Sequence, residues 1–290
     1  RYGRHRVRRI MPAYVITVLA AYLIYHFRTA GPNPPGHTWI GLLRNLTLTQ
    51  IYTDNYMFDG YLHQGLTQMW SLAVEVAFYV ALPVLAWLLL VVVCRRRWRP
   101  GLLLTGLGVL ALMSPPAWMI LVHTTDFLPS GARLWLPGYL AWFIGGMLLT
   151  VLQAMGVRVF GFIVLPLAVV SFVIVSTPIA GEPTTSPTGG LTEALVKTVF
   201  YAAIATLIVA PLALGNRGWY ARALATRPMV WLGEISYEIF LVHLVVMEIA
   251  MVEVLRWPVY TGSAPALFVV TLIMTIPVAW LLHRLTRVRT

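Results

Sequence analysis

The sequence predicts an all-α protein, a polytopic membrane helix bundle with about eight transmembrane helices. Its residues are 59% hydrophobic and only 11% charged, whereas roughly 25% of the residues in a soluble domain are charged. Apolar segments near the length of about 20 residues, which a helix needs to cross a bilayer, recur along the chain. The basic residues gather between alternate segments, and this distribution is typical of membrane topology.

The predicted spans follow one another from the N-terminus. They cover residues 11–27, 70–93, 102–122, 138–155, 159–178, 191–214, 229–251 and 264–283. Between the first two spans, the stretch TWIGLLRNLTLTQIY is moderately apolar but too interrupted to cross, so we expect an interfacial or re-entrant element there. No internal repeat is visible, and we predict one integral-membrane domain over residues 1–290. The pair Gly145 and Gly146 suits close helix packing.

The net charge of +11 is explained by topology rather than by a nucleic-acid partner. With a cytoplasmic N-terminus and alternating spans, 16 of the 21 Lys and Arg residues fall on the cytoplasmic side. The positive-inside rule therefore predicts that both termini of this chain are cytoplasmic. The single cysteine, Cys94, excludes an internal disulfide.

The first candidate site is the basic stretch RHRVRRIMPAY near the N-terminus. Arg6 and Arg9 are three residues apart and share one face of a helix. One interpretation is a topology signal at the membrane edge. The other is an anion site, because arginine forks bind phosphates through paired hydrogen bonds, and a cytoplasmic coenzyme A thioester would fit.

The second candidate is Glu75, a carboxylate inside the apolar stretch QMWSLAVEVAFYVALPVLAW. Ser71 and Tyr79 lie four residues to either side of Glu75, so the three side chains share a helix face. Intramembrane ionisable residues are rare and usually face a protein interior or a cavity. Glu75 either pairs with a buried Arg or Tyr to lock helices, or it orients a histidine or hydroxyl in acyl transfer.

The third candidate is the stretch WLGEISYEIFLVHLVVMEIA, a single predicted span with six polar groups. A helix facing only lipid would not tolerate them, so the span should line a cavity or sit in the bundle core. His243 is either a hydrogen-bonded packing residue or part of a site. The six residues are Glu234, Ser236, Tyr237, Glu238, His243 and Glu248.

Four other histidines lie in or beside the predicted outer loops without the spacing of metal ligands, and we expect no metal site. They are His26, His37, His63 and His123.

The three candidates, in this order, resemble the acyltransferase-3 family of bacterial integral-membrane O-acyltransferases. RVRRIMPAY is similar to that family's Arg-x-x-Arg element, with Arg6 and Arg9 matching. WSLAVEVAFY is similar to its Trp-Ser-Leu-x-Val-Glu element, with Glu75 in the Glu position. LGEISYEIFLVH is similar to its Ser-Tyr-x-x-Tyr-Leu-x-His element, although Phe240 replaces the second Tyr. The resemblance covers nearly the whole chain.

The resemblance implies a multi-pass protein of the bacterial cytoplasmic membrane that moves an acyl group, often acetyl, from cytoplasmic acyl-CoA to a hydroxyl of an envelope glycan or glycolipid. No permanently bound cofactor is implied. Arg6 and Arg9 would grip the donor phosphates, and Glu75 and His243 would be catalytic. The cavity-lining residues would be Ser71, Tyr79, Ser236 and Tyr237.

One departure from the family concerns the N-terminus. The family has about ten helices, and the histidine credited with its catalysis lies on the first of them, ten residues after an arginine. This sequence shows neither residue, so we expect an N-terminal truncation of two helices, and the fragment itself to be inactive without them. Two other classes stay open, a transporter or flippase of a lipid-linked glycan and a non-catalytic membrane scaffold. A transporter would yield no acylated product, and a scaffold would tolerate apolar replacements of Glu75, Ser236 and His243.

Overall fold

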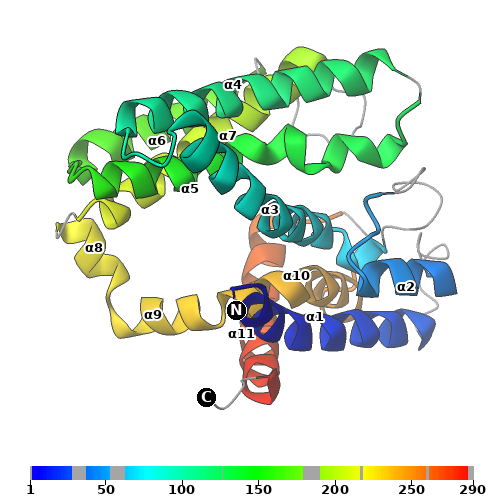
Figure 1. The fold of residues 1–290 in the computed structure, drawn as a ribbon. Coiled ribbons are helices and arrows are strands. Elements are labelled where there is room, and N and C mark those ends of the chain that lie inside the picture. Colours follow the sequence, from blue (N-terminus) through cyan, green and yellow to red (C-terminus); the bar gives the residue numbers. More distant parts are fainter. Residues whose placement is uncertain are drawn as a thin grey trace. The chain divides into compact units, whose positions relative to one another are not determined.

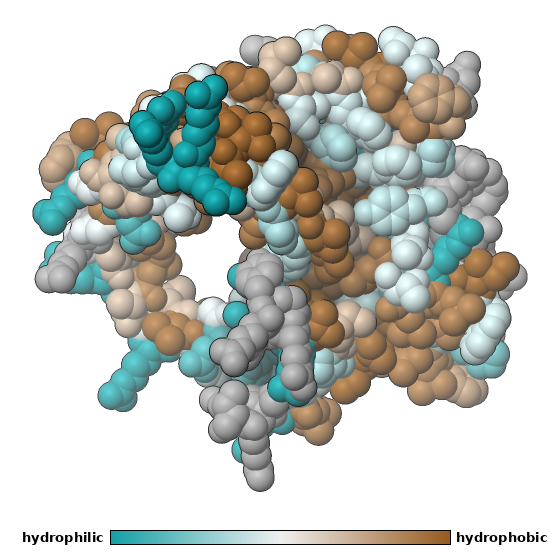
Figure 2. All heavy atoms as spheres, in the orientation of Figure 1, coloured by the Kyte–Doolittle hydropathy of each residue, from teal (hydrophilic) through white to brown (hydrophobic). Residues whose placement is uncertain are grey.

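The chain forms helices joined by turns in the computed structural model, which describes residues 2–27, 37–52, 63–125, 127–178, 190–215, 218–258 and 261–286 (Figure 1). No strand occurs within these ranges, so the predicted all-α class is confirmed. Six of the described helices are long and apolar enough to cross a membrane. Large hydrophobic side chains lie exposed along them, and Figure 2 shows this hydrophobic surface, which suits contact with lipid.

The six long helices match six of the predicted spans. They are α1 (Tyr2–Phe27), α3 (Met69–Trp87, continued by η2, Leu88–Val93), α4 (Pro100–Thr124), α5 (Leu136–Ala154, preceded by η3, Ser130–Leu134), α7 (Leu191–Ala213) and α11 (Ala264–Thr286).

Two predicted spans differ from expectation. Residues 159–178 form α6 (Gly161–Val175), which has only 15 residues. Residues 229–251 form two helices, α9 (Arg227–Glu234) and α10 (Ser236–Ile249, continued by η5, Ala250–Val254), which are bent by 68°. The bend follows Gly233, whose carbonyl accepts a hydrogen bond of 2.8 Å from the Ser236 hydroxyl. Glycine and serine together are a common cause of a helix kink.

The stretch after α1 forms a short helix that does not span, as predicted. It is α2 (Trp39–Leu46), and its first turn is capped by the Thr38 hydroxyl, which accepts from the Gly41 N–H at 3.0 Å. Trp39 on α2 is exposed, whereas Asn45 is fully buried. A further short helix, α8 (Trp219–Leu224), follows α7.

Contacts divide the chain into two compact units. The first consists of Arg1–Ala73 and Arg227–Thr290, and the second of Val74–Thr226. The single domain expected over residues 1–290 stays a prediction.

In the first unit, α1 and α10 run side by side in the same direction (Figure 1). Near the start of both helices, the Tyr237 hydroxyl donates to the Ile10 carbonyl at 3.0 Å. Near their ends, the Tyr25 hydroxyl donates to the Glu248 carboxylate. Helix α11 packs against α10, and His283 near its end lies 3.0 Å from Glu238 near the start of α10.

In the second unit, α3, α4, α5, α6 and α7 pack around an apolar core. Gly145 lets α5 approach α7 closely, because a Cβ at this position would lie 2.1 Å from the Thr206 Oγ1. A Cβ on Gly146 would meet nothing within 4 Å. Only the first glycine of the pair therefore serves helix packing.

Candidate functional site

Three tyrosines on one face of α1 carry polar groups into the core of the first unit. Tyr14, Tyr22 and Tyr25 are spaced for a common helix face and are all buried. The Tyr14 hydroxyl donates to the Asn45 carbonyl at 2.5 Å, and the Asn45 amide lies 3.4 Å from the Tyr22 hydroxyl. Asn45 of α2 thus binds the first two tyrosines, Tyr14 through its backbone carbonyl and Tyr22 through its side-chain amide, while Tyr25 bonds to α10.

The third tyrosine belongs to a buried acid site between α1, α10 and the short helix η1 (Gln64–Leu66). The Glu248 Oε2 accepts from the Tyr25 hydroxyl and from the Gln64 amide, the latter at 3.3 Å. Glu248 is only 8% exposed. Its Oε1 receives no hydrogen bond from a described residue. This oxygen is therefore available to accept a hydrogen bond from a bound molecule.

The aromatic ring of Tyr25 also packs against His63, at the start of η1. The two ring centroids are 4.6 Å apart and the rings are nearly perpendicular. The backbone leaves no room for a side chain beneath this ring, because a Cβ on Gly65 would lie 2.8 Å from the Tyr25 hydroxyl and ring. The turn at η1 therefore needs glycine for the close approach of Tyr25.

His63 is fully buried, and its hydrogen bonds define its tautomer. Its Nδ1 accepts from the Gly65 N–H at 3.3 Å, so a neutral His63 carries its proton on Nε2. That Nε2 lies 3.3 Å from the His37 Nδ1 and donates to it. The proton of a neutral His37 then lies on Nε2, where it can be donated to a substrate oxygen.

Electrostatics keep both histidines neutral. Burial, followed by the neighbouring His37, lowers the pKa of His63 to about 3. Burial and then His26 also lower the pKa of His37. At neutral pH the two rings are therefore uncharged and carry N–H donors.

The residues predicted on α10 lie at different places along the first unit. Tyr237 is half-buried and links α10 to α1 through Ile10. Ser236 is exposed, and its hydroxyl donates a hydrogen bond to the carbonyl of Gly233, three residues earlier. The His243 Nδ1 lies 2.8 Å from the Phe240 carbonyl, to which it can donate, and Nε2 has no partner among the described residues. The structure does not bring Ser236 and His243 into contact through a hydrogen bond.

One face of α3 carries the residues predicted to lie together there, Ser71, Glu75 and Tyr79. Glu75 is half-buried and accepts a hydrogen bond from the Tyr79 hydroxyl, one turn along the same helix. Since donor and acceptor both belong to α3, this bond locks no second helix in place. The Ser71 hydroxyl donates to the Gln68 carbonyl at 3.0 Å and not to Glu75.

Arg6 and Arg9 lie in the first turns of α1. Arg6 is half-buried and Arg9 is exposed. From Arg9 to Tyr25 the helix rises about 24 Å, most of the thickness of a bilayer core. The basic end and the acid site are therefore far apart along α1.

Sequence reasoning missed the cluster of Tyr25, His37, His63 and Gln64, and noted Glu248 only as one polar group among six. The two histidines were set aside because their spacing fits no metal. Among the described residues, no group of three or more metal-ligating side chains occurs. One signal for this cluster was available in the sequence. His63 and Gln64 are adjacent polar residues just before the span that carries Glu75.

Comparison with known proteins gives one match. A profile of the acyltransferase domain family matches residues 1–284. Neither a curated protein nor a solved structure matches the chain. The match covers nearly the whole sequence, including the three motifs on which the resemblance rests. The chain belongs to the acyltransferase-3 family of membrane acyltransferases.

Proposed function

We propose that this acyltransferase takes an acyl group, acetyl in the first instance, from cytoplasmic acyl-CoA and transfers it to a hydroxyl of an envelope glycan or glycolipid. The observation that carries the proposal is the buried site of Glu248, Tyr25 and His63 in a membrane bundle. Acyl transfer to a hydroxyl needs a proton acceptor and a hydrogen-bond donor for the developing oxyanion. The cluster supplies both.

In the proposed reaction, the acceptor hydroxyl gives its proton to the free Oε1 of Glu248, and its oxygen attacks the thioester carbonyl. The His37 Nε2–H stabilises the negative charge on that carbonyl oxygen. The carbon–sulfur bond then breaks, the ester is formed, and the coenzyme A thiolate takes up the proton held by Glu248 as it leaves, which restores the carboxylate. His63 positions His37 by donating to its Nδ1.

The donor is proposed to bind with its phosphates at Arg6 and Arg9, which supply forked cationic donors at the other end of α1. The pantetheine arm would extend along the bundle toward Tyr25, because the two ends are about 24 Å apart along the helix. Glu75, with Tyr79 beside it, and His243, with its open Nε2, remain proposed catalytic groups. Ser71, Ser236 and Tyr237 remain proposed cavity-lining residues. The positive-inside distribution supports an orientation in the bacterial cytoplasmic membrane with both termini of this chain cytoplasmic.

The test is acyl transfer by the native polypeptide reconstituted in liposomes, with acetyl-labelled acetyl-CoA and a glycolipid extract of the envelope. We expect an alkali-labile acetyl ester on the acceptor. Glu248→Gln should lower its rate by roughly 100-fold or more. The exposed Glu253, five residues further along, is the matched control, and Glu253→Gln should leave the rate unchanged. A wild-type protein that makes no acylated product would contradict the proposal and favour a transporter or a scaffold.

A further inference from the structure

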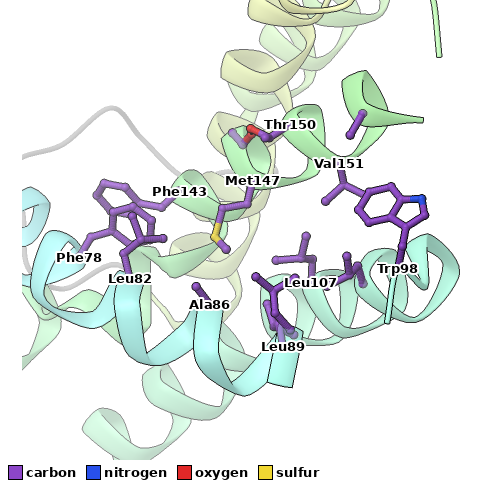
Figure 3. Close-up of a pocket in the computed structure, with 14 residues that line it drawn as sticks. Phe78, Leu82, Ala86, Leu89, Trp98, Leu107, Phe143, Met147, Thr150 and Val151 are labelled. Carbon is purple, nitrogen blue, oxygen red and sulfur yellow. The ribbon is translucent and has the colours of Figure 1, made fainter. Parts of the chain in front are cut away.

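An apolar slot of about 520 Å³ lies within the second unit, between α3, η2, α4 and α5 (Figure 3). Its walls are formed mainly by Phe78, Leu82, Leu89, Leu107, Met147 and Trp98. The size falls in the range of roughly 300–1,000 Å³ that is typical of sites for small molecules. None of the residues so far assigned to acyl transfer lines it.

The slot is long. Along α3 and η2 its lining runs from Phe78 to Leu90, which is about 18 Å of helix. At the Phe78 end, the stacked rings of Phe78 and Phe143 stand 4.3 Å apart. The slot opens to the surroundings along α5, where Gly146 and Thr150 are exposed, and at its other end, where Trp98 is 59% exposed.

The chemistry of the lining selects for hydrocarbon. Its only hydroxyl group, on Thr150, is bonded at 3.0 Å to the Gly146 carbonyl of its own helix. Gly146 and Ala86 keep the slot wide, and the absence of any atom within 4 Å of a Cβ on Gly146 shows that helix packing does not demand glycine there. A sugar or nucleotide would find no partner for its hydroxyls inside.

The open end is strongly basic. The turn between η2 and α4 carries Arg95, Arg96, Arg97 and Arg99 on either side of Trp98, with no acidic residue among them. Figure 2 shows hydrophilic side chains gathered over this turn, beside hydrophobic surface. These four side chains make no hydrogen bond or ion pair with any residue the structure describes.

Two of the four arginines in this turn have an unfavourable backbone conformation. Arg95 and Arg96 have φ of 51° and 57°, a left-handed conformation that L side chains other than Asn and Asp seldom adopt. Residues in this conformation persist where the surrounding structure fixes them. Here a π-helical end, with the Cys94 N–H bonded to the Leu89 carbonyl at 3.0 Å, sets the turn beside the slot.

We propose that this slot binds an acyl chain of an anionic phospholipid, whose phosphate is held by the arginines of the α3–α4 turn. A hydrocarbon slot that opens among unpaired arginines matches both parts of such a lipid. Basic pockets between transmembrane helices bind anionic headgroups in this way. Topology alone explains basic residues at a membrane edge, but it does not require an apolar slot of acyl-chain length to open among them.

The test uses the native polypeptide in phosphatidylcholine nanodiscs that contain trace phosphatidylglycerol with a photoactivatable group in one acyl chain. Cross-linked peptides are mapped by mass spectrometry, and we expect them to come from the lining of the slot. The double variant Arg95→Gln/Arg97→Gln should lower labelling by roughly 25-fold, since each basic residue contributes about fivefold in affinity for an anionic lipid surface. The double variant Arg158→Gln/Arg222→Gln, with two exposed arginines of the same unit, is its control.

Two further variants test the slot itself. Gly146→Leu, and independently Ala86→Leu from the opposite wall, should fill the space and lower labelling by at least about fivefold. Gly101→Leu is the matched control, because Gly101 faces open space and lies outside the slot. Two variants on different helices keep the test valid if one of them fails to fold.

Three outcomes would overturn the proposal. If a phosphatidylcholine probe labels the slot as strongly as the phosphatidylglycerol probe does, the arginines do not select an anionic headgroup. Labelling unchanged in both slot-filling variants would place the lipid elsewhere. If unlabelled long-chain acyl-CoA lowers the labelling by the lipid probe more than unlabelled phosphatidylglycerol does, the occupant of the slot is a thioester. None of these results depends on whether acyl transfer is detected, since the readout is lipid labelling.

Discussion

The Tyr25 hydroxyl and the Glu248 carboxylate are hydrogen-bonded although 223 positions separate them in the chain. The bond joins α1 to α10 near the ends of both helices and places an acid in the core of a membrane unit. Gln64 of η1 completes the contact, so three distant parts of the chain meet at one carboxylate. Charges inside membranes are expensive, and their retention favours a function.

The first prediction concerns the energetic coupling between Tyr25 and Glu248. Tyr25→Phe should destabilise the protein by about 1–3 kcal/mol, because it removes one of two donors from a buried carboxylate. Glu248→Gln should cost a similar amount. The double variant should cost clearly less than the sum, as measured by thermal unfolding in detergent at neutral pH. Strict additivity would show that the hydroxyl and the carboxylate contribute independently.

The second prediction concerns Gly65. Gly65→Ala should displace the Tyr25 ring, because the new Cβ would lie 2.8 Å from it, and so lower both the melting temperature and the acyl-transfer rate. Gly233→Ala provides the comparison in the same unit, since its Cβ would meet nothing within 4 Å. If the two alanine variants behave alike, backbone entropy rather than the Tyr25 contact decides the effect.

The third prediction is a pH dependence from His63. The folded-state pKa of about 3 lies below the ordinary value of 6.5, so the unfolded chain binds more protons between these values. Stability should therefore fall as pH drops through this window, by up to about 1.4 kcal/mol per pH unit from His63. His63→Gln should flatten the slope of melting temperature between about pH 7.5 and about pH 5.

The control for this pH series is His123→Gln. His123 is exposed near the end of α4, and its removal should leave the slope as in the wild type. An unchanged slope in His63→Gln would mean that burial of His63 does not govern acid stability.

The fourth prediction concerns Glu75. Glu75→Gln should lower acyl transfer by roughly 100-fold if this carboxylate takes part in proton transfer. Tyr79→Phe should have a smaller effect, because it removes only the hydrogen bond to Glu75. Rates are compared at equal protein abundance, with Glu193→Gln as a carboxylate control in the same unit. A normal rate in Glu75→Gln would end the proposed role of this residue.

Composition and periodicity were sufficient for the fold class. Long apolar runs gave α1, α4, α5, α7 and α11 because a helix that faces lipid on most sides is apolar throughout. The break at Gly233 was not predicted, since an apolar run does not reveal that Ser236 will take the Gly233 carbonyl. The family resemblance was likewise confirmed, because its motifs lie in order along the chain.

The polar cluster around Tyr25 could not be predicted, because its members come from four separate segments. In the sequence, His37 and His63 belong to or adjoin a predicted outer loop, and nothing there links them to Tyr22 or Tyr25. Only the folded chain shows that His63 is fully buried between their rings. The glycine pair at 145 and 146 was predicted to serve packing, and Gly145 does so against Thr206.

The shared direction of α1 and α10 has a consequence for the membrane. Two helices that cross in the same direction must be separated by an odd number of crossings. Between them, the described helices of sufficient length are α3, α4, α5 and α7, an even number. A crossing by the shorter α6 would make this number odd. Its 15 residues extend only about 22 Å against a hydrocarbon core of about 30 Å, so such a crossing would thin the bilayer beside α6 and bring its two surfaces closer together there.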